Sequence, residues 1–272
     1  MCEIKVFNKI RWSLLTVLTL FFLSCDDNGD LVLFSIQNDK DLGLQVSEQI
    51  ASDSTFNILS EAEYPEAYEY LNSMKNAILS SDDITYKDDF VWKLHIVQDD
   101  VLNAFATPGG YIYVYTGLIQ YLQEADDLAG VIGHEIAHSD QRHSSKQLQR
   151  QYGISALLSI LLGGDSGTLA TIAGNIAGTG ATLAFSRDAE SEADDYSVRY
   201  LSNTEYACNG AASFFQKLID EDNQGGTPEF LSTHPSPDNR VEDINKLAAT
   251  LGCDVNLAEN TGYDDFKALL PK

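Results

Sequence analysis

The spacing of apolar residues changes along the chain from helical to strand-like and back to helical. Between residues 43 and 80 the apolar positions stand at helical spacings that Pro65 interrupts, so we expect helices there. The segment VWKLHIV at 91–97 alternates like a half-buried strand, and YIYVY at 111–115 is rich in strand-forming residues. A turn signal, PGG at 108–110, comes directly before YIYVY. We therefore expect strands joined by this turn in a small antiparallel sheet.

A helical pattern returns after the turn. Residues 130–143, GVIGHEIAHSDQRH, have apolar residues on several sides, which indicates a buried central helix. Residues 154–185 combine a short apolar run with a stretch rich in Gly, Ala and Thr. The run is too short and the stretch too weakly apolar to span a membrane, so we expect closely packed helices there. The fold class that follows is α+β, mainly helical with a small sheet.

The N-terminus has the pattern of an export signal. Three basic residues precede the apolar run at 12–24, which is short for a membrane span. Small and apolar residues before Cys25, followed by the polar stretch DDNGD, resemble the lipobox of bacterial lipoproteins. This pattern predicts that cleavage before Cys25 makes this cysteine the lipid-bearing first residue. An uncleaved anchor or a plain signal peptide is the alternative.

These features divide the chain into three parts. We expect a lipoprotein signal peptide at 1–24, a polar and acidic tether at 25–42, and one folded domain at 43–272. The chain has 272 residues, of which 44% are hydrophobic and 10% aromatic. This composition is sufficient for one sizeable core.

Charge and cysteine content narrow the functional classes. The formal net charge of −24 argues against a nucleic-acid partner, because phosphate binding needs clustered Lys and Arg. Cys208 and Cys253 could pair in an oxidising compartment, although their spacing alone does not show that they meet. Neither lies in a CxxC motif, so cysteine-based zinc or redox chemistry is not expected.

The HExxH motif inside the central helix has the spacing of a zinc site. Residues four apart on a helix differ by about 40° in direction, so His134 and His138 project from one face. Glu135 lies about 100° from His134, near enough to meet a water at the metal without binding the metal itself. The same helical geometry directs His143 away from both histidines. A zinc site needs a third protein ligand, which this helix does not provide.

An acidic segment downstream, FSRDAESEADDYSV at 185–198, can supply that ligand. Glu190 and Asp194 are four apart and share a helical face, whereas Glu192 points roughly to the opposite side. One of the two carboxylates could bind the metal while the other hydrogen-bonds a ligand histidine.

Four blocks of the chain are similar to the HtpX/BepA-type zinc metallopeptidases. This family of gluzincins includes the CAAX prenyl endopeptidases and the mitochondrial inner-membrane quality-control proteases. The blocks stand in the family's order between 103 and 240: NAFATPGGYIYVYTGLI, HEIAHSDQRH, RDAESEADDYSV and STHPSPDNR. HtpX and the prenyl proteases are multi-span membrane proteins, whereas this chain has no convincing span after its signal. The similarity is therefore closer to the periplasmic, lipid-anchored or soluble members. Prenylated substrates are accordingly not expected.

The resemblance implies a zincin-type domain in which His134, His138 and Glu190 hold one zinc ion. Asp194 matches the partner carboxylate of the family's ExxxD motif. The NAF and PGG blocks match the family's edge strand beside the active site. Substrate backbone is then expected to pair with this edge through a set of five residues: Asn103, Ala104, Phe105, Gly109 and Gly110.

The resemblance also implies a role for His234, which lies in the family's HP block. Its imidazole is expected either to stabilise the oxyanion of the reaction or to bind zinc as a fourth ligand in a resting enzyme. Arg240 belongs to the same block. It is expected either to brace the site or to form an ordinary salt bridge.

The function implied is that of a zinc endopeptidase of the bacterial cell envelope. Glu135 is expected to take a proton from the attacking water and pass it to the leaving amine. The expected substrates are misfolded or misassembled envelope proteins, with envelope assembly machinery as a partner and the periplasmic face of the outer membrane as the location. The alternative is a lipid-anchored binding or chaperone protein for envelope assembly with a structural zinc. Glu135 discriminates between the two, because a structural zinc site does not need it.

Overall fold

The computed structural model describes residues 24–25, 31–177, 184–223, 229–236, 239–256 and 262–271. It divides the chain into two units, residues 1–33 and 34–272. In the first unit, β1 (Ser24–Cys25) pairs antiparallel with β2 (Leu31–Val32). Most of the expected signal peptide, residues 1–23, and the start of the tether, residues 26–30, lie outside the described residues.

The second unit begins earlier than the domain boundary expected at 42/43. Helix α1 starts at Ile36, where the side chain of Ser35 accepts a hydrogen bond from Asn38 N and caps the helix. Leu42 is fully buried on α1, so the last part of the expected tether belongs to the core. The elements of this unit are, in chain order, α1 (Ile36–Ser52), α2 (Pro65–Leu79), β3 (Lys93–Val97), β4 (Ala104–Thr107), the 3-10 turn η1 (Pro108–Gly110), β5 (Tyr111–Tyr115), α3 (Thr116–Tyr121), α4 (Ala125–Asp140), α5 (His143–Tyr152), α6 (Ile154–Leu161), α7 (Ser166–Ala177), α8 (Arg187–Leu201), α9 (Ala211–Asn223), α10 (Glu229–Thr233), α11 (Arg240–Leu251) and α12 (Tyr263–Ala268).

The mainly helical α+β class is confirmed, but the sheet is mixed rather than wholly antiparallel. Its strand order is β3-β5-β4, with β5 parallel to β3 and antiparallel to β4. The turn at 108–110 reverses the chain as expected, and the left-handed backbone of Gly109 (φ 76°) and Gly110 (φ 90°) suits glycine. After the turn, β5 lies between β4 and β3. It is antiparallel to β4, which precedes the turn, and parallel to β3. The turn residues predicted the reversal, whereas the position of β3 depends on long-range packing.

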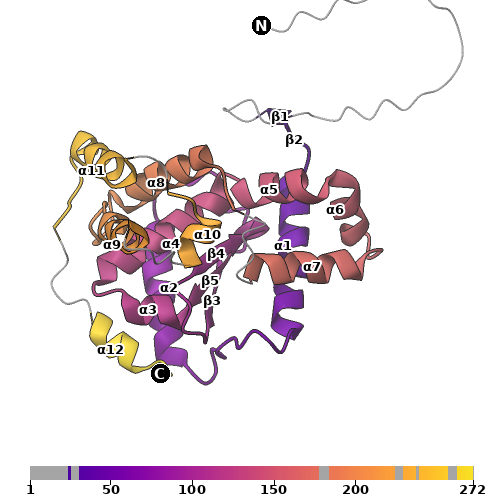
Figure 1. The fold of residues 1–272 in the computed structure, drawn as a ribbon, viewed down its shortest axis with the longest axis horizontal. Coiled ribbons are helices and arrows are strands. Elements are labelled where there is room, and N and C mark those ends of the chain that lie inside the picture. The colour runs from indigo at the N-terminus through magenta and orange to yellow at the C-terminus, as the bar shows by residue number, and fades with distance from the viewer. Residues whose placement is uncertain are drawn as a thin grey trace, which may run out of the picture. The chain divides into compact units, whose positions relative to one another are not determined.

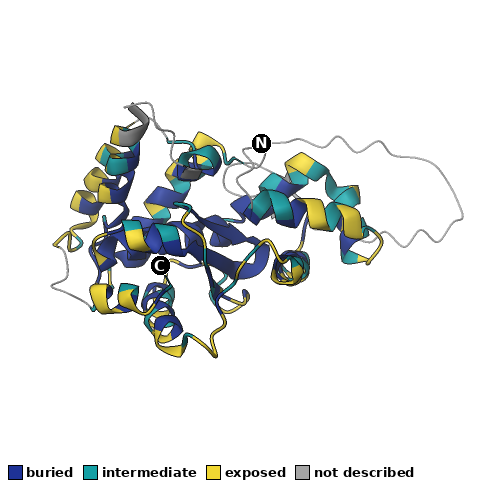
Figure 2. Cartoon of the chain, turned by 60° about the horizontal axis from the view of Figure 1, so that its bottom comes forward, coloured by how far each residue is buried: buried dark blue, intermediate teal, exposed yellow. Residues whose placement is uncertain are grey.

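The alternation of YIYVY places β5 in both halves of the core. Ile112 and Val114 pack in the cluster that contains the apolar residues of α2 and α4. The three tyrosines, Tyr111, Tyr113 and Tyr115, pack in the cluster with α1 and α7. Both faces of the sheet are therefore covered. Strands β4 and β5 are buried at every position, and the sheet is mostly dark blue in Figure 2.

Helix α4 runs through the middle of the unit with all its residues buried, as the apolar residues around its circumference predict. It packs against α8, α9 and β4, as the central position of α4 in Figure 1 illustrates. Gly130 permits the close approach to α9, because a Cβ atom there would lie 2.1 Å from the backbone nitrogen of Ala211. Because α4 is buried, a polar side chain on it is costly unless it has a partner, so its polar residues indicate a functional site.

Helices α6 and α7 account for most of the segment expected to form packed helices. They pack against α1 and against each other. Among the described residues no single helix has both the length and the apolar character of a membrane span. Together α6 and α7 meet that criterion, but they are bent by 109° relative to each other.

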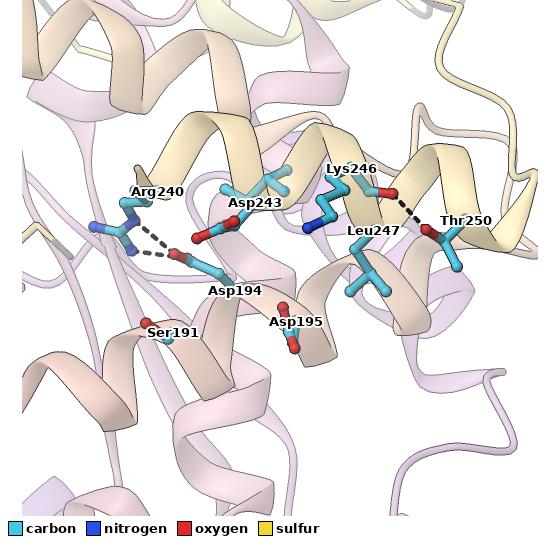
Figure 3. Close-up of a pocket in the computed structure, with 9 residues that line it drawn as sticks. Ser191, Asp194, Asp195, Arg240, Asp243, Lys246, Leu247 and Thr250 are labelled. Carbon is cyan, nitrogen blue, oxygen red and sulfur yellow. Dashed lines mark hydrogen bonds and ion pairs between the residues drawn. The ribbon is translucent and has the colours of Figure 1, made fainter. Parts of the chain in front are cut away.

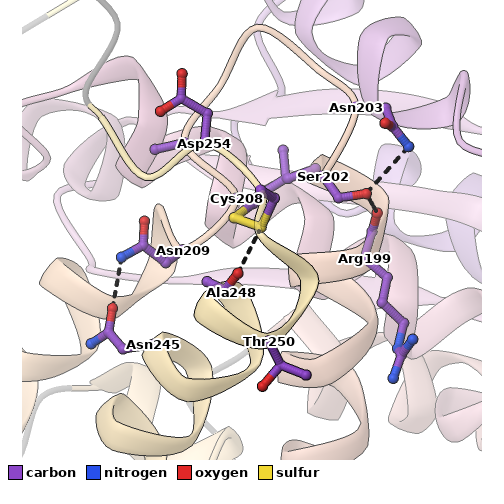
Figure 4. The surroundings of a disulfide bond; sticks show 12 residues. Arg199, Ser202, Asn203, Cys208, Asn209, Asn245, Ala248, Thr250 and Asp254 are labelled. Carbon is purple, nitrogen blue, oxygen red and sulfur yellow. Dashed lines mark hydrogen bonds between the residues drawn. A yellow bond between two sulfur atoms is a disulfide. The ribbon is translucent and has the colours of Figure 1, made fainter.

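Cys208 and Cys253 form a disulfide bond, with Cα atoms 6.2 Å apart. The bond joins the connection between α8 and α9 to the residue after the C-terminal cap of α11 (Figure 4). A hydrogen bond from Cys208 N to Asp254 O, 2.8 Å long, reinforces this link. The pairing that spacing alone left open is therefore present.

We expect reduction of this disulfide to lower the free energy of unfolding by about 4 kcal/mol, since the bond closes a loop with a sequence separation of 45. Urea unfolding of the chain with and without reductant measures the difference. A Cys208→Ala/Cys253→Ala double variant should show no response to reductant. Coinciding midpoints for oxidised and reduced wild-type chain would contradict the prediction.

Candidate metal centre

Helix α4 brings His134 and His138 together as the HExxH spacing predicts. Both side chains are fully buried, and their Nε2 atoms lie 3.0 Å apart. Burial and the neighbouring His134 lower the pKa of His138 well below its usual value, which favours the neutral imidazole that binds metals. Two such nitrogens facing one point are half of a tetrahedral site.

Helix α8 adds the two carboxylates that share its inner face. Glu190 is fully buried, with Oε2 3.4 Å from His134 Nε2 and Oε1 3.3 Å from His138 Nε2. Asp194 Oδ1 lies 2.9 Å from His134 Nδ1, on the side of the ring away from Glu190. Burial alone lowers the pKa of His134, but Asp194 and Glu190 raise it to about 9. By these distances Glu190 faces the Nε2 atoms of both histidines, and Asp194 contacts His134 from the other side of its ring, as an orienting carboxylate would.

His234, directly after α10, completes the cluster. Its Nδ1 lies 3.1 Å from Glu190 Oε1 and 3.4 Å from His134 Nε2. Its ring stacks on Phe230 at 4.3 Å between centroids, which holds it in this position. One atom from each of four side chains, those of His134, His138, Glu190 and His234, lies within 4.8 Å of the others. Three imidazole nitrogens and one carboxylate form a donor set that suits zinc.

Glu135 lies beside this cluster, and its carboxylate is not hydrogen-bonded to any residue that the structure describes. It is fully buried, and neither carboxylate oxygen has a hydrogen-bond partner among the residues that the structure describes. The nearest imidazole nitrogen of His234, Nε2, is 3.6 Å from Oε1. Burial raises the pKa of Glu135, and the neighbouring His234 and His134 offset part of this increase. A buried carboxylate of this kind is costly unless a cation or a polar ligand satisfies it, so the residues present fit a bound metal.

Arg240 braces the site from α11. Its Nε and Nη2 each lie 2.8 Å from an oxygen of Asp194, and Nη2 is also 3.1 Å from Glu190 Oε2. Figure 3 shows Arg240 reaching from α11 to Asp194 on α8. Its guanidinium carbon lies 3.4 Å above the ring centroid of Phe215. Of the two interpretations that fitted Arg240, the brace is the one observed.

His143 lies beside the site, contrary to the helical extrapolation, and Glu192 is its partner there. Helix α4 ends at Asp140, and Arg142 has a left-handed backbone (φ 59°, ψ 26°) before α5 begins at His143. His143 Nδ1 consequently lies 3.0 Å from His138 Nδ1, and its Nε2 lies 3.0 Å from Glu192 Oε2. The expectation that His143 points away from the two histidines was wrong, because it continued helix α4 through a turn. The polar run SDQR after the motif was the only signal of that turn. Glu192 lies on the unbroken helix α8, off the buried face of Glu190 and Asp194, and reaches the site through His143.

The expected substrate-binding residues fall into two groups. Asn103 precedes β4, and Ala104 and Phe105 lie on it; β4 is an edge strand that packs against α4. The structure does not bring Gly109 and Gly110 to the same place. Gly109 lies close to Lys40 on α1, and Gly110 close to Trp92, where a side chain would meet backbone atoms.

A small cavity lies between the edge strand and the metal-ligand cluster. Phe105 and Ala106 form one side of it, and His234, Phe185 and Ile176 lie among the residues on the other sides. The segment around α7 thus borders the strand edge in this conformation.

The buried HExxH helix, the carboxylate from a second helix and the carboxylate–histidine contact together define a gluzincin-type metallopeptidase centre. The chain belongs to Peptidase family M48, whose sequence profile matches residues 65–248. The resemblance noted from the four sequence blocks is confirmed.

Individual relatives come from bacteria and from mitochondria. The chain is 28% identical over 75% of its length to the mitochondrial metalloendopeptidase OMA1 of Schizosaccharomyces pombe, covering 61% of that protein. It is 32% identical over 68% of its length to the putative beta-barrel assembly-enhancing protease of Vibrio cholerae, covering 40% of it. For the beta-barrel assembly-enhancing protease of Escherichia coli the identity is 30% over 68% of this chain and 39% of the relative. The chain thus spans less than two thirds of the length of each of these relatives.

Proposed function

We propose that this chain is a zinc-dependent endopeptidase of the bacterial cell envelope that hydrolyses misfolded or misassembled envelope proteins. The observation that carries the proposal is Glu135, a buried carboxylate without a hydrogen-bond partner in the described part of the chain, placed beside a four-residue cluster that could hold a metal. The membership in Peptidase family M48 agrees with it.

In this proposal His134, His138 and Glu190 hold one zinc ion per chain. Asp194 orients His134 through its 2.9 Å contact with Nδ1, and Arg240 fixes both carboxylates. Bound zinc supplies Lewis-acid chemistry, polarising the scissile carbonyl and making water acidic enough to attack near neutral pH.

Glu135 acts as the general base and acid. Its unpaired oxygens take a proton from the attacking water and deliver it to the leaving amine. Because burial raises its pKa, the carboxyl group can hold that proton between the two steps.

For His234 two roles were expected, and the geometry favours one for this conformation. Its Nδ1 lies within the ligand cluster, which supports a fourth-ligand role in a resting enzyme. Withdrawal of His234 from that position opens a place for substrate, and there the imidazole can stabilise the oxyanion.

The substrate backbone is proposed to pair with β4. Tyr115 N donates to Asn103 O, so the alternation of an antiparallel pair turns the backbone groups of Asn103 and Phe105 toward β5. The backbone N–H and C=O of Ala104 then face away from β5, on the outer side of the edge strand. Ala106 O, on the same side, accepts a hydrogen bond from Ser144 Oγ. Ala104 is therefore the residue best placed to pair with substrate, flanked by the side chains of Asn103 and Phe105.

The proposed location is the periplasmic face of the outer membrane, anchored by a lipid on Cys25. The sequence around Cys25 and the disulfide between Cys208 and Cys253 support an oxidising compartment outside the cytoplasm. The relatives named beta-barrel assembly-enhancing protease support envelope assembly machinery as a partner, whereas other relatives are named as mitochondrial enzymes.

The alternative, a binding or chaperone protein with a structural zinc, is not favoured. A structural site uses all its ligands to hold the metal and needs no additional carboxylate. Among the described residues, Glu135 has no hydrogen-bond partner that would explain its burial.

The first test is the zinc content of the purified chain. We expect one zinc per wild-type chain and a markedly lower content in Glu190→Ala, because this variant loses one of the four donors of the cluster. Metal analysis after dialysis against a weak chelator measures both, and circular dichroism controls for folding. Wild-type chain without zinc, or a folded Glu190→Ala that retains a full complement, would contradict the proposed site.

A further inference from the structure

His143 and Glu192 extend the metal centre beyond the residues that the sequence pattern assigned to it. Nδ1 of His143 lies 3.0 Å from Nδ1 of His138, on the side of the His138 ring opposite the ligand nitrogen. Nε2 of His143 lies 3.0 Å from Glu192 Oε2. His143 is buried, and the side chain of Glu192 is 27% exposed. The three side chains form a continuous hydrogen-bonded chain from the protein surface to a metal-ligand residue.

We propose that His143 and Glu192 are positioning residues that set the tautomer and ring orientation of His138. This inference rests on the proposed zinc site. His138 faces the cluster with Nε2, so that nitrogen must be free of a proton to bind metal. The proton of the neutral ring then lies on Nδ1 and is donated to His143 Nδ1.

The contacts of His143 determine which of its nitrogens carries the proton. Two nitrogens in contact can share only one proton, so His143 Nδ1 must accept and cannot also donate. The proton of His143 therefore lies on Nε2, which donates to the carboxylate of Glu192. Each link has a donor on one side and an acceptor on the other, and the opposite tautomer of His138 would block its ligand nitrogen.

The ring of His138 is also held from a second direction. The ring of Phe185 stacks on it with 3.9 Å between centroids and an interplanar angle of 17°. Stacking fixes the plane of the imidazole, and the contact with His143 fixes its rotation within that plane. His134 receives the equivalent support directly from Asp194. Both histidines of α4 are thus oriented by a carboxylate, through an intervening imidazole in the case of His138.

The turn between α4 and α5 places His143 in this position. Nε of Arg142 contacts Asp39 Oδ2 at 2.6 Å, and its Nη2 donates to Phe34 O, which anchors the left-handed residue of the turn. Ser144 Oγ donates to Ala106 O on β4 at 2.8 Å. His143 therefore lies between two anchored neighbours, so its contact with His138 does not depend on a mobile side chain alone.

Zinc affinity of the full chain tests the proposal. Competition with a fluorescent zinc chelator should show that His143→Leu weakens zinc binding by about 10- to 100-fold, as loss of such support typically does. His143→Gln retains an acceptor for His138 and a donor for Glu192, so it should bind zinc more tightly than His143→Leu. Glu192→Leu should weaken binding by about tenfold. Asp188→Leu removes an exposed carboxylate of the same helix and should leave the affinity unchanged.

A spectroscopic measurement reports the tautomer directly. In zinc-loaded chain labelled with ¹⁵N-histidine, we expect long-range ¹H–¹⁵N correlations to show a protonated Nδ1 on His138 and a protonated Nε2 on His143. A His138 Nδ1 without a proton overturns the proposal. If His143→Leu does not fold, Glu192→Leu decides the outcome, because its partly exposed position tolerates substitution.

Zinc binding by wild-type chain and by the variants distinguishes an error in the positioning role from an error in the proposed function. Wild-type chain that binds no zinc overturns both. Wild-type chain that binds one zinc, together with folded His143→Leu and Glu192→Leu variants of unchanged affinity, overturns only the positioning role.

Discussion

Replacing Glu135 with Gln is expected to reduce proteolysis by roughly 10²- to 10⁴-fold, the usual contribution of a general base. The amide is nearly isosteric with the carboxylate but cannot accept the proton of the attacking water. Both oxygens of Glu135 lack hydrogen-bond partners among the described residues, so no hydrogen bond to those residues is lost. The cleavage rate of fluorescently labelled, unfolded casein measures the effect.

The companion measurements separate catalysis from metal binding. Glu135→Gln should retain one zinc per chain, because Glu135 is not among the four residues whose donor atoms cluster. Its free energy of unfolding should equal or exceed that of wild type, because the variant no longer buries an unpaired carboxylate. Unchanged cleavage by a zinc-loaded Glu135→Gln chain would exclude Glu135 as the base. It would also return the chaperone alternative to consideration.

Replacing Arg240 with Met is expected to lower the free energy of unfolding of the zinc-free chain by about 3–5 kcal/mol, the range for breaking a buried ion pair. Arg240 is 2% exposed and lies between two buried carboxylates, those of Glu190 and Asp194. Met preserves much of the side-chain volume, but it leaves both carboxylates without their cation and removes the stacking on Phe215. Urea denaturation of zinc-free protein measures the loss.

The matched control for this prediction is Arg199→Met. Arg199 lies on α8, near the end of the helix that carries Glu190, and is only half-buried. Its removal should cost less than about 1 kcal/mol, as for a surface ion pair. Equal losses in the two variants would mean that the contacts of Arg240 add nothing beyond those of an ordinary arginine.

Local spacing predicted which side chains of the site share a face on each helix. His134 and His138 share a face because they are four residues apart, and the same holds for Glu190 and Asp194. Helix geometry depends only on neighbouring residues, so these pairs could be derived before any tertiary structure was known. His143 marks the limit of this reasoning, since one left-handed residue, Arg142, redirected the chain.

The sheet and the domain start show the same limit. The turn at 108–110 and the strand-forming residues of YIYVY are local signals, and both were predicted. The parallel pairing of β3 with β5 is not local, because residues 98–110 separate the two strands. Residues 25–42 were predicted to be a tether because they are largely polar, yet α1 begins within them at Ile36. Of the residues of α1 before position 43, only Asp39 and Leu42 are buried, so the sequence pattern gave little sign of a helix there.

The sequence by itself determined the residues that carry the chemistry, namely the HExxH pair and the carboxylates four apart on a second helix. It also determined the mainly helical fold class. Tertiary structure alone decided how these parts converge. Packing of α4 against α8 brings His134 within 3.4 Å of Glu190, 56 residues away, and His234 joins them across 100 residues. Contacts at such separations follow from burial of many apolar surfaces at once, which local periodicity does not encode. The arginine brace and the chain from Glu192 through His143 to His138 became visible only through that convergence.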